Sequence, residues 1–156
     1  MKRLRNFIAA IVISPELLVC LVLLGVFAYY PGLFESLGMK MRADDEVWKH
    51  LPALTILFSG LAFKFSSKLR APLENQSNKV LYEWPHYRLL KDRVMVSLVF
   101  SSVSGIVGLG LWVLGRPAEP KIVGLVFLAA TGTAAITALT MLLAHQTLRE
   151  LLETHA

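Results

Sequence analysis

The chain is poor in cysteine and in charged residues. Cys20 is the one cysteine among 156 residues, and Asp, Glu, Lys and Arg together make up 17%, against about 25% in soluble domains. A single cysteine excludes an internal disulfide and a cysteine-cluster metal site. The low charge content, with 55% hydrophobic residues and a mean hydropathy of +0.58, excludes an ordinary soluble domain.

Catalytic motifs are missing as well. The four histidines are scattered, and the sequence contains no His-Glu-x-x-His motif, no phosphate-binding loop and no pair of carboxylates within an apolar stretch. We therefore predict that the protein is not an enzyme and that it binds no cofactor and no metal.

Four long apolar stretches dominate what remains. We expect membrane-spanning helices at about 15–30, 48–67, 93–115 and 121–145, because about 20 mostly apolar residues cross a hydrocarbon core of about 30 Å. The predicted fold class is therefore an all-α integral membrane protein with four transmembrane helices. We expect one polytopic domain over residues 1–156, built as a four-helix bundle.

The first stretch is interrupted by a helix-start signature, Ser14-Pro15-Glu16. Serine can cap a helix, proline suits its first position, and glutamate complements the helix dipole. We expect a short interfacial N-terminal helix before this signature, a membrane helix after it, and a short extension beyond Pro31. The alternative is a single helix kinked at Pro15, which places Glu16 well inside the bilayer.

The second stretch has a short apolar centre, with Pro52 near its start and Lys64 just past its end. It could form a re-entrant hairpin or a helix buried among its neighbours. We favour a full crossing, because Trp48 at one end suits a membrane interface and the lysine at the other can extend to the headgroups.

Lysine and arginine are distributed unevenly between the loops, and cytoplasmic loops of membrane proteins are enriched in both. With the N-terminus inside, the cytoplasmic side carries ten of them: Lys2, Arg3, Arg5, Lys68, Arg70, Lys79, Arg88, Lys91, Arg93 and Arg149. The other side carries five: Lys40, Arg42, Lys49, Arg116 and Lys121. We therefore expect both termini in the cytoplasm, a cytoplasmic connection over 66–93 and a cytoplasmic helical extension over 145–154.

The net charge of +5 fits this orientation, because the cytoplasmic leaflet carries anionic lipids. We expect the membrane to be the inner membrane of a bacterium.

Small residues recur at spacings of four on the third and fourth stretches, so that they share helix faces. They are Ser101, Ser104, Gly105 and Gly108 in the third stretch, and Ala130, Ala134 and Ala138 in the fourth. Helix association in lipid depends on close backbone approach and on hydroxyl hydrogen bonds. We expect these helices to pack tightly, within one chain or across a homo-oligomer.

Glu16 is the intramembrane polar candidate, because an ionisable residue within a membrane helix usually marks a pathway or a coupling site. The other interpretation is a carboxylate at the headgroup level that only starts a helix. If Glu16 is buried, its expected partners are Lys64 or the hydroxyls of Ser101, Ser104, Thr137 or Thr140.

The cytoplasmic connection mixes aromatic with basic residues. They are Tyr82, Trp84, Tyr87, Arg88, Lys91 and Arg93. Basic residues near the membrane bind anionic lipid, and aromatic residues with arginine are also enriched at the centres of protein interfaces. A nucleic-acid contact uses similar residues and is less favoured here.

The leading hypothesis is a non-enzymatic inner-membrane subunit that oligomerises and anchors, or senses for, a cytosolic protein partner. A toxin-immunity or defence module is one such setting. The alternative is a homo-oligomeric pore or channel lined by the hydroxyl-rich faces of the third and fourth helices. A stable co-purifying partner would favour the first hypothesis, and ion flux across liposomes would favour the second.

Overall fold

The computed structural model describes residues 11–12, 14–70 and 87–155. In these residues the regular structure is helical and contains no strand, which confirms the all-α prediction for this part of the chain. The interfacial helix expected before Ser14 lies almost entirely outside the described residues. The helices are α2 (Pro15–Tyr29), α3 (Pro31–Ala43), α4 (Asp45–Arg70), α6 (Tyr87–Leu114) and α7 (Pro120–His155).

Local sequence signals explain where these helices begin. The hydroxyl of Ser14 accepts a hydrogen bond from the backbone N–H of Leu17 at 3.0 Å, so the predicted cap of α2 is confirmed. A carboxylate oxygen of Asp44 accepts from the backbone N–H of Glu46 at 2.9 Å and starts α4 in the same way. Proline occupies the first position of α2, α3 and α7, where a helix needs no N–H donor.

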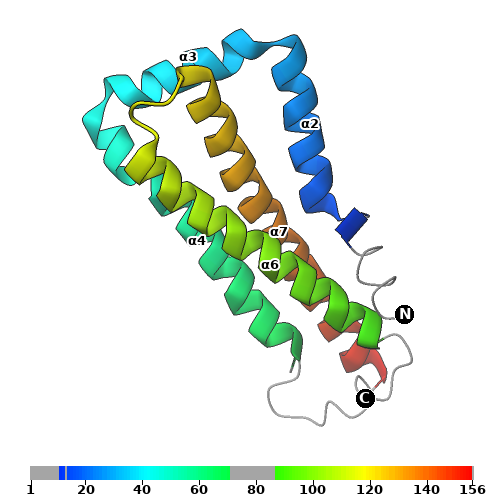
Figure 1. The fold of residues 1–156 in the computed structure, drawn as a ribbon. Helices are drawn as coiled ribbons and strands as arrows, with labels where there is room; N and C mark the ends of the chain where they lie inside the picture. Colours follow the sequence, from blue (N-terminus) through cyan, green and yellow to red (C-terminus); the bar gives the residue numbers. More distant parts are fainter. Residues whose placement is uncertain (1–10, 13, 71–86, 156) are drawn as a thin grey trace.

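The helices form two groups, which we call the bundle and the arm. The bundle consists of α4, α6 and α7, which lie side by side (Figure 1). The arm consists of α2 and α3, whose axes differ by 101° across the break at Tyr30. As a result α3 crosses the end of the bundle where α7 begins, while α2 packs along α7.

The bundle is held by stripes of buried residues that recur every three or four positions. On α4 these are Trp48, Leu51, Thr55, Ser59, Ala62, Ser66 and Leu69, and on α6 they are Val94, Ser97, Ser101, Ser104, Gly108 and Leu111. This spacing is the one that keeps a seam facing a neighbour in packed helices. Large side chains stand at the ends of both stripes and small ones in the middle, so the helix centres can approach closely.

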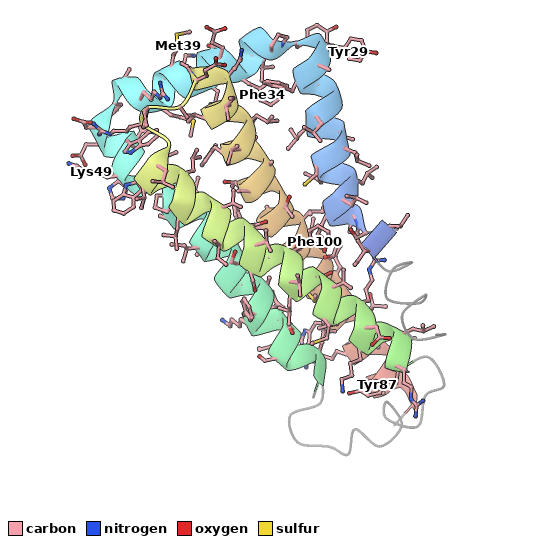
Figure 2. All side chains as sticks on the ribbon, viewed as in Figure 1. Tyr29, Phe34, Met39, Lys49, Tyr87 and Phe100 are labelled. Carbon is pink, nitrogen blue, oxygen red and sulfur yellow. The ribbon has the colours of Figure 1, made fainter. Side chains whose placement is uncertain are left out.

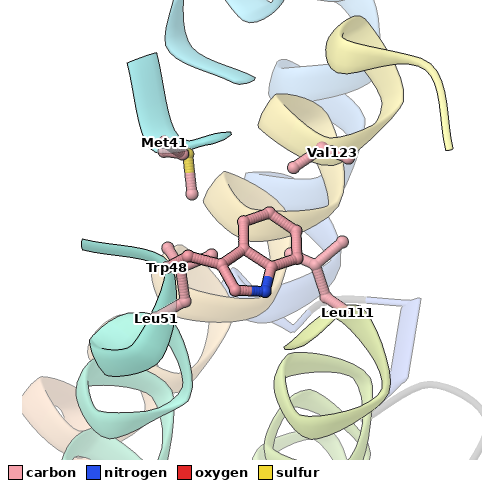
Figure 3. Close-up of a cluster of buried hydrophobic side chains, with 5 residues drawn as sticks. All are labelled: Met41, Trp48, Leu51, Leu111 and Val123. Carbon is pink, nitrogen blue, oxygen red and sulfur yellow. The ribbon is translucent and has the colours of Figure 1, made fainter. Parts of the chain in front are cut away.

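Trp48 fills the end of the bundle near α3. Its ring is 3% exposed and packs among Met41, Leu51, Leu111 and Val123 (Figure 3). We predicted Trp48 as an anchor at the lipid interface, and that prediction is wrong for the side chain. It does lie at a helix end, but a residue of α3 and the start of α7 cover the ring.

The arm reaches the bundle through two glycines. A Cβ on Gly124 of α7 would collide with the backbone carbonyl of Phe34, and a Cβ on Gly38 of α3 would collide with the carbonyl of Pro120. Phe34 is itself fully buried and lies on the side of α3 that faces α7 (Figure 2). The short extension expected beyond Pro31 is therefore a separate helix, pressed onto α7 by backbone contact.

Within the described residues, two helices are long and apolar enough to cross a membrane. They are α6 and the part of α7 over Pro120–Leu152, each with a mean hydropathy of 2.1. The arm adds a third candidate if α2 and α3 count as one broken span. α4 is continuous from Asp45 to Arg70, so the hairpin considered for 48–67 does not form. Charged residues near both of its ends make it more polar than the other candidates. The fold is thus a helical membrane protein with two to three candidate spans.

Candidate functional site

A polar contact joins α2 to the middle of α7, and we call it the α2–α7 seam. The sulfur of Cys20 lies 3.4 Å from the hydroxyl oxygen of Thr133. One turn away, the hydroxyl of Thr137 lies 3.3 Å from carboxyl oxygen Oε1 of Glu16. The spacing of four residues on both helices brings the two pairs together.

Glu16 is fully buried in this seam. Its second oxygen, Oε2, has no hydrogen-bond partner in the structure. Thr137 lies about 25 Å along α7 from Pro120 at 1.5 Å per residue, inside the candidate span Pro120–Leu152. Glu16 is thus both the first-turn carboxylate of a capped helix and a side chain buried between helices.

Only one of the partners expected for a buried Glu16 contacts it, namely Thr137. The hydroxyl of Thr140 donates instead to the backbone carbonyl of Thr137 at 3.0 Å. Ser101 and Ser104 belong to the buried stripe of α6, and Lys64 is exposed on α4.

A second polar contact, the α4–α6 seam, holds the bundle together. The hydroxyl of Ser59 donates to the backbone carbonyl of Ser101 at 3.0 Å. Gly108 faces Thr55, and a Cβ on this glycine would stand 3.0 Å from the threonine side chain. Thr55 also pairs with Thr131 of α7 at 3.1 Å. The small face of α6 thus packs on α4, a pairing that the sequence did not indicate.

The alanine stripe of α7 is also used inside the chain. Ala130, Ala134 and Ala138 are all buried. The hydroxyls of α7 point in two directions, with Thr131 toward α4 and Thr133 toward α2. A single hydroxyl-lined face shared by α6 and α7 is not formed in this arrangement.

The last turns of α4, the first turns of α6 and the last turns of α7 meet at one end of the molecule, which we call the basic end (Figure 1). Arg88 and Lys91 are exposed there, and Tyr87 is half-buried at the start of α6 (Figure 2). A mostly apolar hollow of about 190 Å³ lies beside them, lined by Leu69, Tyr87, Leu90, Lys91, Val94 and Met95. Tyr82 and Trp84 lie outside the described residues.

The opposite end, which α3 crosses, is closed by a set of polar contacts, and we call it the crossed end. The guanidinium of Arg42 donates to the backbone carbonyls of Gly115 and Ala118 in the turn between α6 and α7. Arg116 pairs with Asp45 at 2.5 Å and lies over the ring of Trp48. These contacts tie the arm, α4 and the turn into one unit.

No group of three or more His, Cys, Asp and Glu side chains that could hold a metal occurs among the described residues. No protein-family model, curated protein or solved structure matches the chain. The two seams and the two ends are therefore the candidate functional features of the described residues.

Proposed function

We propose that the protein is a non-enzymatic subunit of a bacterial inner membrane that anchors, or senses for, a cytosolic protein. It crosses the membrane four times, with the basic end and both termini in the cytoplasm. The partner docks on the basic end through an acidic surface. The difference in charge between the two ends carries this proposal.

The basic end has a strong excess of positive charge among the described side chains. Six cations stand against two anions there, namely Lys64, Lys68, Arg88, Lys91, Arg93 and Arg149 against Asp92 and Glu150. At the crossed end the charges balance, with Lys40, Arg42, Lys49, Arg116 and Lys121 against Glu35, Asp44, Asp45, Glu46 and Glu119. The positive-inside tendency supports a cytoplasmic position for the basic end.

α7 supplies a platform at that end. Its 36 residues span about 54 Å, which exceeds a hydrocarbon core of about 30 Å by several turns. Met141 and Leu148, near its cytoplasmic part, pack with Leu69 of α4 and Val94 of α6. The helical extension therefore continues the bundle, and it can present a fixed surface to a partner.

Four crossings require that α4 also spans the membrane. Its 26 residues cover about 39 Å, and its charged residues lie near its two ends, within reach of the headgroups. The hydroxyls of Thr55 and Ser59 are buried against α7 and α6, where lipid does not meet them. Packing in the bundle supports a crossing that its composition alone does not.

Homo-oligomerisation remains part of this proposal, but it needs a surface other than the small-residue faces, which are buried within one chain. The outer face of α6, with Val99, Val103 and Ile106 exposed, is one apolar surface that could serve. A pore lined by hydroxyls has no comparable support, because Ser101 and Ser104 are buried within the chain and Thr131 and Thr133 contact Thr55 and Cys20.

The docking proposal is tested by co-purification in mild detergent followed by mass spectrometry. We expect Arg88→Glu/Lys91→Glu to reduce recovery of the partner by about ten-fold or more, because like charges across an interface cost several kcal/mol. Lys40→Glu/Lys49→Glu is the matched control at the crossed end and should retain the partner. Equal losses in both pairs, or no loss in the first, would contradict the proposal.

Anionic lipid is a second partner of the same surface, and nanodiscs separate it from protein. We expect the co-purified protein to rebind in nanodiscs of zwitterionic lipid alone. Binding that appears only with anionic lipid would show that the basic end recognises the membrane instead.

The topology is tested by single cysteines in a Cys20→Ser background. Glu119→Cys and Gln146→Cys should react with an impermeant maleimide from opposite sides of the membrane. Labelling of both from one side would exclude both the four-span arrangement and the orientation.

A further inference from the structure

A hollow of about 610 Å³ lies at the crossed end, in the corner where α3 passes into α4, and the proposed function gives it no role. Its lining includes Leu37 of α3, Leu54 of α4 and Phe127 of α7. Small-molecule sites occupy about 300–1,000 Å³. The hollow is therefore large enough for a ligand or for a length of hydrocarbon chain.

The walls of this hollow are mostly apolar and continue the buried core at the same end of the bundle. Four lining side chains also pack in the cluster that contains Trp48 (Figure 3), namely Leu37, Met41, Leu51 and Phe127. A bound water molecule needs two to four polar partners, which such walls do not offer. The part of an occupant that enters the hollow is therefore apolar.

The polar residues of the hollow lie toward the start of α4. Glu46 and His50 line it there, whereas Ala53 and Leu54 line it deeper along the helix. The ammonium group of Lys49 pairs with the carboxylate of Glu46 at 2.8 Å, so this rim carries both signs of charge (Figure 2). Leu54 lies about 12 Å along α4 from Glu46 at 1.5 Å per residue. If α4 crosses the membrane, the rim lies near the headgroups and the deeper part lies among acyl chains.

A helix from a second copy or from a partner fits this hollow less well than a lipid chain does. One helical turn, 10–12 Å wide and 5.4 Å long, fills about 400–600 Å³, so the hollow admits about one turn. α3 lies across the end of the bundle (Figure 1) and closes the hollow there with Leu37 and Met41. A helix entering alongside α4 would end against α3 with unpaired backbone groups in apolar surroundings. A hydrocarbon chain has no such groups.

We propose that the hollow binds one acyl chain of a zwitterionic phospholipid whose head group contacts the rim. The ammonium group of the lipid faces Glu46, and its phosphate faces Lys49. The balance of cations and anions at the crossed end favours a zwitterionic head group over an anionic one.

The chain and the head group contribute differently to this binding. An acyl chain gains little hydrophobic free energy by leaving other lipids, so the preference for one lipid comes from the head group. The chain supplies dispersion contacts between α3 and α4, and it thereby holds the arm on the bundle. This inference rests on the proposed crossing of α4 and not on the docking of a partner.

Analysis of retained lipid tests the proposal with the full chain. The protein is reconstituted with equal amounts of phosphatidylethanolamine and phosphatidylglycerol, extracted in mild detergent and examined by native mass spectrometry. We expect the wild type to retain a phospholipid, with phosphatidylethanolamine in several-fold excess. Ala53→Trp fills the hollow and should abolish retention, whereas Ile56→Trp, at an exposed position of α4 outside the hollow, should preserve it. No retained lipid in the wild type, equal retention in both variants or a preference for phosphatidylglycerol would overturn the proposal.

The head-group contact is tested by Glu46→Gln/Lys49→Gln. Both side chains are exposed, so the fold should persist while the preference for phosphatidylethanolamine disappears. A preference that survives this change would contradict the contact.

Thermal unfolding gives an independent readout of occupancy, because a ligand that binds the folded state raises its unfolding temperature. Adding phosphatidylethanolamine to delipidated protein should raise this temperature in the wild type and not in Ala53→Trp. An equal rise in both would overturn the proposal, and so would release of a second copy or of another protein by Ala53→Trp. If the cysteine labelling supports four crossings and these lipid tests fail, the lipid site alone is wrong.

Discussion

Polar side chains and glycines join the helices of the bundle to one another, and they also join the arm to the bundle. The two sets of contacts are distributed differently. In the bundle, contacts between α4 and α6 recur every turn from Trp48 to Leu69. In the arm, they are concentrated at the crossing of α3 over α7 and at the α2–α7 seam. The buried polar side chains described in the bundle are serines and threonines, whereas the seam of the arm contains Glu16.

The largest loss of stability is expected when the packing between helices of the bundle is disturbed. Gly108→Leu places a large side chain against Thr55, where even a Cβ stands at 3.0 Å, and should destabilise the protein by about 2–3 kcal/mol. The measurement is the unfolding temperature in detergent. Gly110→Leu is the control on the same helix, because nothing lies within 4 Å of its Cβ. A similar loss in both variants would show that α6 does not depend on close approach to α4.

The arm can be loosened separately at its crossing. Gly124→Leu forces α3 away from α7 at Phe34, and the bundle should remain folded. Cys20, the sole cysteine, reports the result because it lies in the α2–α7 seam. We expect its maleimide labelling rate to rise several-fold, while Gly110→Leu leaves the rate unchanged. Unchanged labelling in both would mean that α3 does not hold α2 in place.

At the crossed end, Arg42 is expected to contribute more to the unfolding free energy than Arg116, which is exposed. Arg42→Met removes bonds to two backbone carbonyls and should cost about 1–2 kcal/mol in unfolding free energy. Arg116→Met removes an ion pair whose side chains are 61% and 71% exposed, and it should cost about 0–1 kcal/mol. Denaturation of both variants in one detergent gives the ranking, and the reverse order would contradict this account.

The smallest effect is expected from single hydroxyls. Thr55→Val removes the bond to Thr131 and should cost about 0.6 kcal/mol, the average for hydrogen bonds between membrane helices. Thr133→Val at the α2–α7 seam should cost no more in stability, but it should speed the labelling of Cys20. If Cys20 is labelled at the same rate in Thr55→Val and Thr133→Val, the two seams do not differ in how they hold α2.

Local features of this fold could be predicted from sequence, and pairings between helices could not. Ser14 marked the start of α2, because a cap depends on neighbours within one turn. The small stripe on α6 was visible as well, but which helix it meets depends on the whole arrangement. Thr55 and Ser59 were not among the expected packing residues, because their partners Thr131 and Ser101 are distant in sequence.

Trp48 and α3 also show that contacts between helices could not be predicted from the sequence. The position of Trp48 at a helix end was evident, but the burial of its ring depends on Met41 arriving from another helix. The crossing of α3 depends on Gly38 and Gly124, which are far apart in sequence. Glu16 was recognised as a candidate, and only the fold could select Thr137 from the partners considered.

The break at Tyr30 gives the arm a mechanical property. α3 fixes one end of α2 against the bundle, and Glu16 lies at the other end, about 20 Å away at 1.5 Å per residue. A rotation of about 10° at the break therefore moves Glu16 by about 3.5 Å, enough to separate it from Thr137. Cys20, closer to the pivot, moves about two thirds as far. A small change of the angle between α2 and α3 therefore makes or breaks the hydrogen bond between Thr137 and Glu16.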